Sequence, residues 1–366
     1  MPWPASADLL APLAPWFERV RRDMPWRAAN LDGPHPDPYE VLVSELMLQQ
    51  TQVATVTPYF RRWMAQFPTV QALAEAEDDA VHKAWEGLGY YRRARFLKAA
   101  AGSIAADGWP GDLAGLTGLP GLGPYTAAAV GAIAFQWPTP ALDGNAFRVL
   151  ARLLLIDGDP KDRAPDLRAW LAPALRDLGP SRLTQALMEL GATVCTPTPA
   201  CAGCPLSLHC QARLSGRTAE IPPIAKRAKV KTTTLWLVAF EAEGQVLLQP
   251  PRTTGLLAGL WRLPAFDLAD FPPVPAAQAP HVITAWTGWT QVYTHRREVV
   301  TPLRIRMPAL FLPAKDHHWV STADLPDLPL GKRDQRFRDL LASPGQTPLE
   351  SADAAELIQA CAAPSA

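Results

Sequence analysis

Four of the five cysteines lie close enough in the sequence to hold one metal centre. Cys195, Cys201, Cys204 and Cys210 fall within sixteen residues and are separated by gaps of five, two and five residues. Thiolates in such a pattern bind either a tetrahedral zinc ion or an iron–sulfur cluster. Zinc sites usually contain two C-x2-C pairs, and this chain has only one. The spacing therefore favours a 4Fe–4S cluster as the cofactor and leaves zinc as the alternative. Cys361 lies in the C-terminal tail and is not expected to contribute.

A glycine hairpin forms a second candidate site. The stretch Leu119–Ala129 reads LPGLGPYTAAA. Pro124 suits the first position of a helix, because the N–H that proline lacks has no intrahelical partner there. The amides of Gly121 and Gly123 then point at the helix N-terminus, which favours an anion such as phosphate. The alternative is an ordinary packing corner between two helices, and the glycines, the proline and the small residues that follow argue together against it.

These candidate residues lie mostly in an N-terminal part with helical periodicity. Apolar residues recur at helical spacing between prolines and glycines over Leu9–Arg22, Tyr39–Trp63, Asp78–Trp85, Arg92–Ala106, Tyr125–Gln136, Ala146–Leu155, Asp166–Leu175 and Arg182–Val194. After about residue 214, short runs rich in β-branched and aromatic residues predict strands over Thr232–Glu241, Gln245–Gln249, His281–Trp286, Gln291–His295, Thr301–Leu312 and His318–Val320. Phe337–Ala342 is predicted to form a closing helix.

The pattern predicts a multidomain protein. We expect an all-α domain over residues 1–214, with the hairpin at 116–129 and the cysteine loop at 195–210. A basic linker over residues 215–231, an α+β domain over 232–346 and a tail over 347–366 complete the chain.

Composition is that of a globular protein with 48% hydrophobic and 19% charged residues. The formal net charge is zero, so the overall charge gives no support to nucleic-acid binding, and any DNA-binding face would have to arise from local segregation of charge. No signal peptide is evident, and prolines and glycines break the uncharged run Leu113–Leu142 before it reaches the ~20 residues of a membrane span. We expect a monomer in the cytoplasm, associated with the nucleoid through DNA.

Longer motifs, in order along the chain, resemble a known family. The hairpin, LDGN at Leu142–Asn145 and the four cysteines resemble the endonuclease III superfamily of helix-hairpin-helix DNA glycosylases. Further motifs are similar to its adenine DNA glycosylase (MutY) branch: MPWR (Met24–Arg27), SELMLQQTQV (Ser44–Val53), WEGLGYYRRAR (Trp85–Arg95), ALMELGATVC (Ala186–Cys195) and GLLAGLWRLP (Gly255–Pro264). The first cysteine gap is five residues here and usually six in the family, but all four thiolates remain.

The resemblance gives two carboxylates a catalytic role. Breaking an N-glycosidic bond requires one protonated carboxyl for the leaving base and one ionised carboxylate for the oxocarbenium-like sugar. Glu45 has mostly apolar neighbours one helical turn away, so we expect desolvation to raise its pKa. Asp143 precedes a helix, where nearby amides favour its charge. Surface charge and helix capping are the ordinary alternatives. The family pattern implies that Glu45 protonates adenine N7 and later helps to activate water, while Asp143 stabilises or briefly bonds to C1′.

Tyr125 limits the chemistry that the resemblance implies. Bifunctional relatives carry a lysine at this hairpin position, whose amine forms a Schiff base and cuts the strand. A phenol cannot form a Schiff base, so we expect a monofunctional glycosylase that leaves an abasic site. Asn145 matches a position that orients Asp143 or the sugar.

The family pattern also assigns residues to base flipping and to the adenine pocket. Gln50, Leu88 and Tyr90 match positions that wedge beside the lesion pair while the base leaves the stack. Trp26, Arg27, Leu48 and Glu189 match positions that line the adenine pocket. Core or surface positions are the ordinary alternatives for these residues.

The C-terminal part resembles the MutT-like domain of the same branch, which has a Nudix-type fold. A Nudix hydrolase needs several glutamates on one helix to hold Mg²⁺, and Glu298 is the only glutamate between Gly244 and Leu349. In the family this domain recognises 8-oxoguanine through a Phe-Ser-His loop. The matching segment here reads Tyr293-Thr294-His295, which keeps a hydroxyl and the histidine; an incidental strand end is the alternative.

The residues and the resemblance together predict a DNA N-glycosylase that removes adenine opposite 8-oxoguanine or guanine in double-stranded DNA. Tyr125 argues against a bifunctional glycosylase/lyase of the endonuclease III type. Glu45 and Asp143 argue against a non-catalytic iron–sulfur protein that only binds damaged DNA.

Overall fold

The computed structural model describes residues 3–223, 230–253, 255, 257–267, 282–293, 296–310 and 316–343. Contacts between Cα atoms divide the chain into two compact units. The first unit contains Met1–Ala76 and Arg93–Lys226, and the second contains Glu77–Arg92 and Arg227–Ala366. Neither unit is therefore a continuous stretch of the chain. Helix α6 (Asp78–Ala84) lies in the first half of the sequence but groups with the C-terminal strands.

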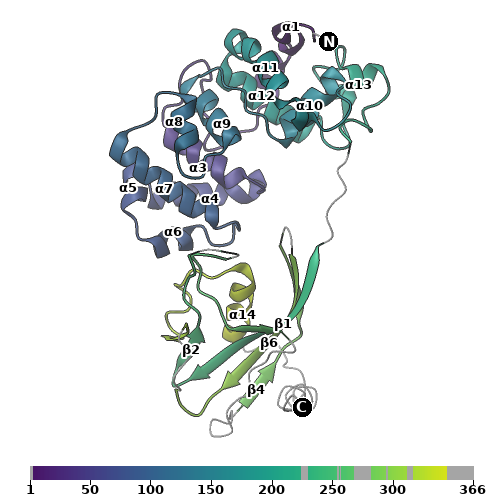
Figure 1. Cartoon of the computed structure of the whole chain (residues 1–366). Helices are drawn as coiled ribbons and strands as arrows, with labels where there is room; N and C mark the ends of the chain where they lie inside the picture. The colour runs from purple at the N-terminus through teal and green to yellow at the C-terminus, as the bar shows by residue number, and fades with distance from the viewer. Residues whose placement is uncertain are drawn as a thin grey trace. The chain divides into compact units, whose positions relative to one another are not determined.

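The first unit is entirely helical (Figure 1). Its helices are α1 (Ser6–Leu10), α2 (Leu13–Val20), α3 (Pro38–Leu48), α4 (Val53–Gln66), α5 (Val70–Glu75), α7 (Arg92–Asp107), α8 (Leu113–Gly118), α9 (Pro124–Phe135), α10 (Gly144–Leu154), α11 (Ala164–Leu178), α12 (Pro180–Thr193) and α13 (Gln211–Leu214), with 3-10 turns η1 (Pro160–Arg163) and η2 (Cys201–Gly203). The prediction of an all-α first domain is confirmed.

Helix α9 is the buried centre of one half of this unit. Every residue from Thr126 to Ala134 is buried, because alanine, glycine and valine let neighbouring helices approach from all sides. Helices α3, α8 and α12 each pack on it. The helix begins at Pro124, as predicted. Because α3 packs on α9, Glu45 on α3 is held beside the hairpin helix.

Two long helices predicted from periodicity are wrong, because each is broken in the structure. The range Leu9–Arg22 forms α1 and α2, with Pro12 at the N-cap of α2. The range Tyr39–Trp63 forms α3 and α4, separated by a turn in which Gln50 has φ 58°. The guanidinium of Arg93 donates hydrogen bonds of 2.7, 2.9 and 2.6 Å to the carbonyls of Leu46, Met47 and Gln49. These carbonyls are satisfied without a continuing helix. The short helices α5 and α8 were not predicted.

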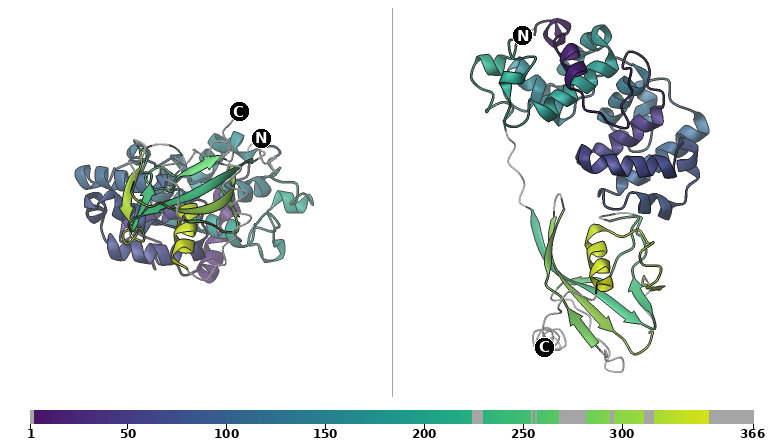
Figure 2. Two further views of the ribbon diagram at one scale, coloured as in Figure 1. Left: turned by 90° about the horizontal axis from the view of Figure 1, so that it is seen from below. Right: turned by 180° about the vertical axis from the view of Figure 1, so that it is seen from behind.

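The second unit is an α+β fold, as expected. Its mixed seven-stranded sheet has the order β4-β6-β1-β2-β7, with β3 beside β1 and β5 beside β6. The strands are β1 (Lys231–Ala242), β2 (Gln245–Leu248), β3 (Ala265–Asp267), β4 (Val282–Ala285), β5 (Trp289–Val292), β6 (Arg296–Arg306) and β7 (His318–Ser321). The long central strands β1 and β6 run parallel, and α14 (Lys332–Ala342) lies on one face of the sheet, where Phe337 packs against the strands (Figures 1 and 2).

Several strand bounds differ from those predicted. The range Gln291–His295 was predicted as one strand, but β5 ends at Val292 because the Tyr293 amide donates a 2.7 Å hydrogen bond to the Arg296 carbonyl and closes a turn. β6 consequently begins at Arg296, five residues before the predicted start, and ends at Arg306 rather than at Leu312. β3 was not predicted, and the closing helix α14 begins at Lys332 rather than at Phe337. No helix among the described residues is long and apolar enough to cross a membrane.

Candidate active site and cysteine loop

Glu45 is a buried carboxyl on α3. Only 7% of the residue is exposed, and its helix neighbours Val41 and Leu42 are buried as well. Burial raises the pKa of Glu45 to about 7, and the nearby charge of Asp143 adds to this increase. A hydrogen bond from Tyr125 acts in the opposite direction. A carboxyl with this pKa retains its proton near neutral pH and can donate it.

Asp143 is the N-cap residue of α10. Its Oδ1 accepts a 2.7 Å hydrogen bond from the Ala146 amide, and its Oδ2 accepts a 2.9 Å bond from Asn145 Nδ2. Asp143 therefore caps the helix, as one interpretation of the sequence expected, and this geometry is also compatible with the catalytic interpretation. The cap holds the carboxylate in a single orientation at the positive end of the helix.

Tyr125 connects the hairpin to the carboxyl pair. Its hydroxyl donates a 3.1 Å hydrogen bond to Glu45 Oε2. Burial, followed by the charges of Glu45 and Asp143, raises the pKa of Tyr125 well above the ordinary phenol value. The structure thus brings the predicted catalytic residues Glu45, Tyr125 and Asp143 close together. Asn145 is hydrogen-bonded to Asp143. Tyr125 remains a neutral hydrogen-bond donor.

The hairpin presents its backbone outward. Gly121 has φ 77°, and a Cβ there would lie 2.3 Å from Phe96 Cβ, so this position needs glycine for two reasons. Gly123 is the exposed N-cap of α9, with no heavy atom within 4 Å of its would-be Cβ. Within the described residues, no acceptor is bonded to either glycine amide. The geometry suits a phosphate oxygen at the N-terminus of α9.

Two of the residues predicted to line an adenine pocket, Arg27 and Glu189, form a largely buried ion pair. Glu189 on α12 is 1% exposed and bonds to Arg27 at 3.1 Å and to Arg22 at 2.5 Å. Arg27 also donates a 2.9 Å hydrogen bond to Gln185 Oε1. Trp26 is buried with its ring edge against Phe60, and Leu48 is half-buried at the end of α3.

Sequence reasoning did not identify Arg22 and Gln185 beside this ion pair. Gln185 precedes Glu189 by one helical turn on α12, so the i, i+4 spacing was a usable signal. Nothing in the sequence pairs Arg22 with Glu189, because the two residues are 167 positions apart.

The three predicted wedge residues lie in turns with left-handed backbone. Gln50 is exposed with φ 58° and belongs to the first unit. Tyr90 belongs to the second unit, has φ 49° and is 46% exposed. Leu88 follows Gly87 in the same turn and is 6% exposed. A left-handed backbone at a glutamine and at a tyrosine is uncommon and occurs where the surroundings fix it.

All four cysteines of the predicted cluster line one pocket. Cys195, Cys201, Cys204 and Cys210 surround it together with Arg152, which is 3% exposed. Arg152 Nη1 lies 3.4 Å from Cys195 Sγ, and Cys210 Sγ donates to the Arg152 carbonyl at 3.4 Å. Among the described residues, no three ligands converge closely enough to hold a single metal ion. Four cysteine side chains that line one pocket provide the ligand set of a cluster held by four thiolates.

Helix α10 connects the cysteine loop to Asp143. Arg148 on this helix donates 2.7 Å hydrogen bonds to the Cys195 carbonyl and to Asn145 Oδ1, and a 2.8 Å bond to the Gly191 carbonyl. Asn145 in turn donates to Asp143. Arg148 and Arg152 were not identified from the sequence, although the spacing of residues 145, 148 and 152 places them on one helix face.

In the second unit, Tyr293 directly follows β5, and Thr294 and His295 lie outside the described residues. Glu298 on β6 is 1% exposed and pairs with Arg296 at 2.5 Å and with Arg333 at 3.4 Å. The glutamate singled out from the sequence is therefore held in a buried ion-pair cluster. Its oxygens bind guanidinium groups of the chain itself.

The chain is similar in sequence to a known family of DNA repair proteins. The family described as HhH-GPD superfamily base excision DNA repair protein matches residues 43–173. An adenine DNA glycosylase of Schizosaccharomyces pombe is 30% identical over 396 residues, covering 86% of this chain and 85% of the relative. An adenine DNA glycosylase of Arabidopsis thaliana is 39% identical and covers 70% of this chain and 47% of the relative. The chain spans about half the length of several such curated relatives.

The helical fold also has a solved counterpart. A thermostable thymine-DNA glycosylase superposes with a TM-score of 0.50 at 24% identity, over 57% of this chain and 96% of that chain. This similarity concerns the fold alone. The identity to curated relatives, extending over most of the Schizosaccharomyces pombe protein, shows that the chain belongs to the adenine DNA glycosylase family.

Proposed function

We propose that this chain is a monofunctional DNA N-glycosylase that removes adenine paired with 8-oxoguanine or guanine and leaves an abasic site. The observation that carries the proposal is the pairing of Glu45 with Asp143. Glu45 is buried with its pKa raised to about 7, and Asp143 is held by two N–H donors. Two carboxyl groups in different environments are the requirement for cleaving a glycosidic bond.

In this proposal Glu45 acts first as a general acid. Its proton passes to N7 of the flipped adenine, which makes the base a better leaving group as the C1′–N9 bond breaks. The electron pair of that bond leaves with adenine, and the sugar becomes cationic. Glu45, now ionised, accepts a proton from the water that attacks C1′, so the carboxyl returns to its starting state.

Asp143 and Tyr125 support this charge change. The Asp143 carboxylate stabilises the sugar cation at the N-terminus of α10, and Asn145 keeps it oriented. Tyr125 hydrogen-bonds to Glu45 and strengthens as a donor when that carboxyl ionises. A phenol offers no amine for a Schiff base, which supports base removal without strand cleavage.

The exposed hairpin amides and the wedge turns support binding to double-stranded DNA. In this proposal Gly121 and Gly123 receive a backbone phosphate. Gln50 of the first unit, and Leu88 and Tyr90 of the second, are the residues proposed to act beside the lesion pair when the base leaves the stack. Extrusion costs roughly a few kcal/mol. Trp26, Arg27, Leu48 and Glu189 are proposed to line the pocket that receives the adenine.

We further propose that Cys195, Cys201, Cys204 and Cys210 hold a 4Fe–4S cluster. When bound, the cluster cross-links the loop between α12 and α13. Arg152 Nη1 lies 3.4 Å from Cys195 Sγ, so a guanidinium group stands beside the proposed cluster ligands. The purified protein is then brown, with broad visible absorbance that iron chelation removes; a colourless protein that retains stoichiometric zinc would contradict the assignment.

We propose that the segment Tyr293-Thr294-His295 recognises 8-oxoguanine. We also propose that the protein acts as a monomer in the cytoplasm, at the nucleoid. The test uses end-labelled duplexes with adenine opposite 8-oxoguanine, adenine opposite thymine, or an oxidised pyrimidine. Strand breaks only in the first duplex, and only after alkali, support the proposal. Breaks without alkali, or efficient borohydride trapping through an active-site lysine, would instead indicate the bifunctional alternative.

A further inference from the structure

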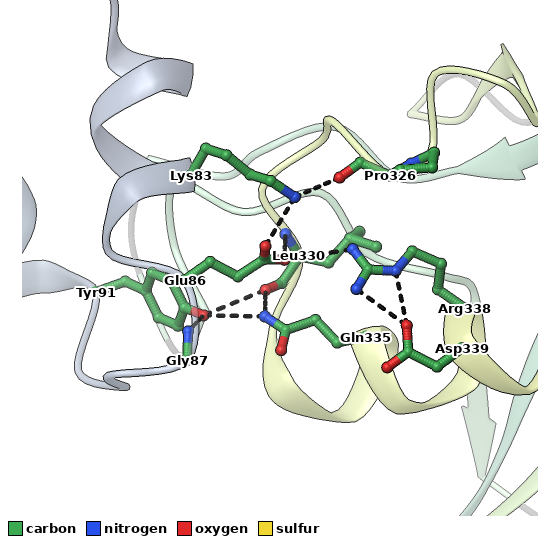
Figure 3. A network of polar contacts seen from close by, with 9 residues as sticks. All are labelled: Lys83, Glu86, Gly87, Tyr91, Pro326, Leu330, Gln335, Arg338 and Asp339. Atoms are coloured by element: carbon green, nitrogen blue, oxygen red, sulfur yellow. Dashed lines mark hydrogen bonds and ion pairs between the residues drawn. The ribbon is translucent and has the colours of Figure 1, made fainter. Parts of the chain in front are cut away.

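The segment Glu77–Arg92 groups with the C-terminal residues of the second unit. It contains α6 and the turn that carries Leu88 and Tyr90. Figure 3 shows the polar contacts between this segment and the residues around α14. These contacts join positions more than 200 residues apart in the sequence.

The Tyr91 hydroxyl is at the centre of these contacts. It donates a 3.2 Å hydrogen bond to the Leu330 carbonyl and accepts bonds from the Gly87 amide at 3.2 Å and from Gln335 Nε2 at 3.4 Å. A phenol has one donor and two acceptor positions, so all three are used. Gln335 also donates a 2.6 Å bond to the Leu330 carbonyl.

A charged cluster lies beside Tyr91. The Glu86 carboxylate is 14% exposed, accepts from the Leu330 amide at 3.3 Å and lies 3.7 Å from Arg338. Its other oxygen is 2.8 Å from Lys83 Nζ, and Lys83 also donates to the Pro326 carbonyl. Partly buried, charge-assisted bonds of this kind are stronger than exposed pairs.

A close backbone approach adds to the polar contacts. Gly259 in the motif GLLAGLW has φ 83°. A Cβ at this position would lie 2.6 Å from the ring of His82 on α6. The position therefore accepts only glycine without displacement of the helix.

These contacts hold both ends of the wedge turn. Gly87 and Tyr91 are joined directly by a hydrogen bond, and only Leu88, Gly89 and Tyr90 lie between them. The Trp85 indole donates a 3.0 Å bond to the Gly89 carbonyl inside the turn. Gly87, Gly89 and Tyr90 all have left-handed backbone, so the turn has little freedom while its ends are fixed.

We propose that the C-terminal domain positions the Leu88–Tyr90 turn for base extrusion through Tyr91 and Glu86. This proposal rests on the proposed glycosylase function. Tyr91 and Glu86 are positioning residues. Leu330, Gln335 and Arg338 are the residues of the C-terminal domain that support them, and we call these three the supporting residues. The supporting residues fix the turn and do not contact the opposite base. Loss of their contacts with Tyr91 and Glu86 therefore slows extrusion equally on adenine·8-oxoguanine and adenine·guanine pairs.

The test compares the full-length wild type with Tyr91→Phe and Glu86→Gln, each of which keeps the side-chain shape. Asp339→Asn is the matched control, since this exposed carboxylate bonds to Arg338 without contacting the segment Glu77–Arg92. Single-turnover excision is measured on both mispairs, and extrusion is followed by 2-aminopurine fluorescence. We expect about a fivefold or greater loss for Tyr91→Phe and Glu86→Gln on both mispairs, with the control unchanged. Wild-type rates, or a loss confined to the 8-oxoguanine duplex, would overturn the proposal.

Hydrogen exchange of the DNA-free proteins separates this proposal from the proposed function. In Tyr91→Phe, the amides of residues 85–91 are expected to exchange at least tenfold faster than in the wild type, at an unchanged melting temperature of the first unit. Unchanged exchange would contradict the proposal that the supporting residues fix the turn, even if adenine is excised. Absence of adenine excision by the wild type would contradict the proposed function, while faster exchange in the variant would still show that the supporting residues fix the turn.

Discussion

The Tyr125 hydroxyl donates a 3.1 Å hydrogen bond to Oε2 of Glu45. One residue belongs to the hairpin helix α9 and the other to α3, 80 positions earlier. The bond joins the part of the protein proposed to hold the DNA backbone to the carboxyl proposed to protonate the base. It also opposes the pKa increase that burial causes in Glu45.

The first prediction concerns the pH dependence of excision. The rate requires protonated Glu45, whose pKa is raised to about 7, so single-turnover excision is expected to fall tenfold per pH unit above that value. Glu45→Gln should reduce the rate by at least a thousandfold and retain duplex binding. A wild-type rate that stays level from pH 6 to pH 9 would contradict the role of Glu45 as the acid.

The same residue predicts a pH-dependent stability. The unfolded chain releases the Glu45 proton near pH 4.5, whereas the folded chain keeps it to about pH 7. Unfolding free energy therefore falls as pH rises through this window, by about 3 kcal/mol for a shift of this size. In Glu45→Gln no carboxyl ionises at this position, so its free energy of unfolding does not fall in this way. The variant should therefore be more stable than the wild type at pH 8 but not at pH 4. Urea unfolding at both pH values measures the difference; equal stability at pH 8 would argue against a buried, charged Glu45.

A third prediction concerns Tyr125. Tyr125→Phe removes a bond that lowers the pKa of Glu45, so the decline of the excision rate should move to higher pH. Tyr59→Phe is the control, since Tyr59 is half-buried on α4 and stacks with Arg62. The pH profile of single-turnover excision is the measurement. A profile that moves to lower pH in Tyr125→Phe is the contrary result.

A fourth prediction concerns the packing of α12 on α10. A Cβ at Gly191 would lie 2.5 Å from Asn145 Cβ, so Gly191→Ala should displace Asn145 and weaken its bond to Asp143. We expect at least a tenfold lower excision rate with duplex affinity nearly unchanged. Gly102→Ala is the control, because no heavy atom lies within 4 Å of its Cβ position inside α7. That variant should keep wild-type activity and gain about 0.5–1 kcal/mol in stability.

A fifth prediction concerns the hairpin. Gly121→Ala forces a Cβ against Phe96 at a left-handed backbone position, so it should distort the hairpin and weaken duplex binding by tenfold or more at low salt. Gly118→Ala at the end of α8 meets no heavy atom within 4 Å and serves as the control. Fluorescence anisotropy with an undamaged duplex reports the affinity. Equal affinities of the two variants would exclude the hairpin from phosphate binding.

The parts of the site that the sequence could predict are those with a local cause. Pro124 at the start of α9 and the left-handed glycine Gly121 follow from backbone chemistry within a few residues. The raised pKa of Glu45 was expected from apolar residues one turn away. In each case the neighbours that determine the property are close in the sequence.

Features with distant causes could not be predicted in this way. The break between α3 and α4 depends on Arg93, whose guanidinium bonds to carbonyls more than 40 residues earlier. Apolar periodicity continues through the break, so it indicated one helix. The pairing of Arg22 with Glu189 and the early start of β6 likewise depend on tertiary contacts that propensity does not contain.

The division of the chain has a consequence for the order in which contacts form during synthesis. Glu86 and Tyr91 leave the ribosome long before Leu330, to which both are hydrogen-bonded across about 240 residues. Because chains are synthesised at roughly 5–20 residues per second, about ten seconds or more pass between the synthesis of α6 and that of Leu330. The turn that carries Tyr90 therefore acquires its final support only after Leu330 has been synthesised, and a chain truncated before Leu330 never acquires it.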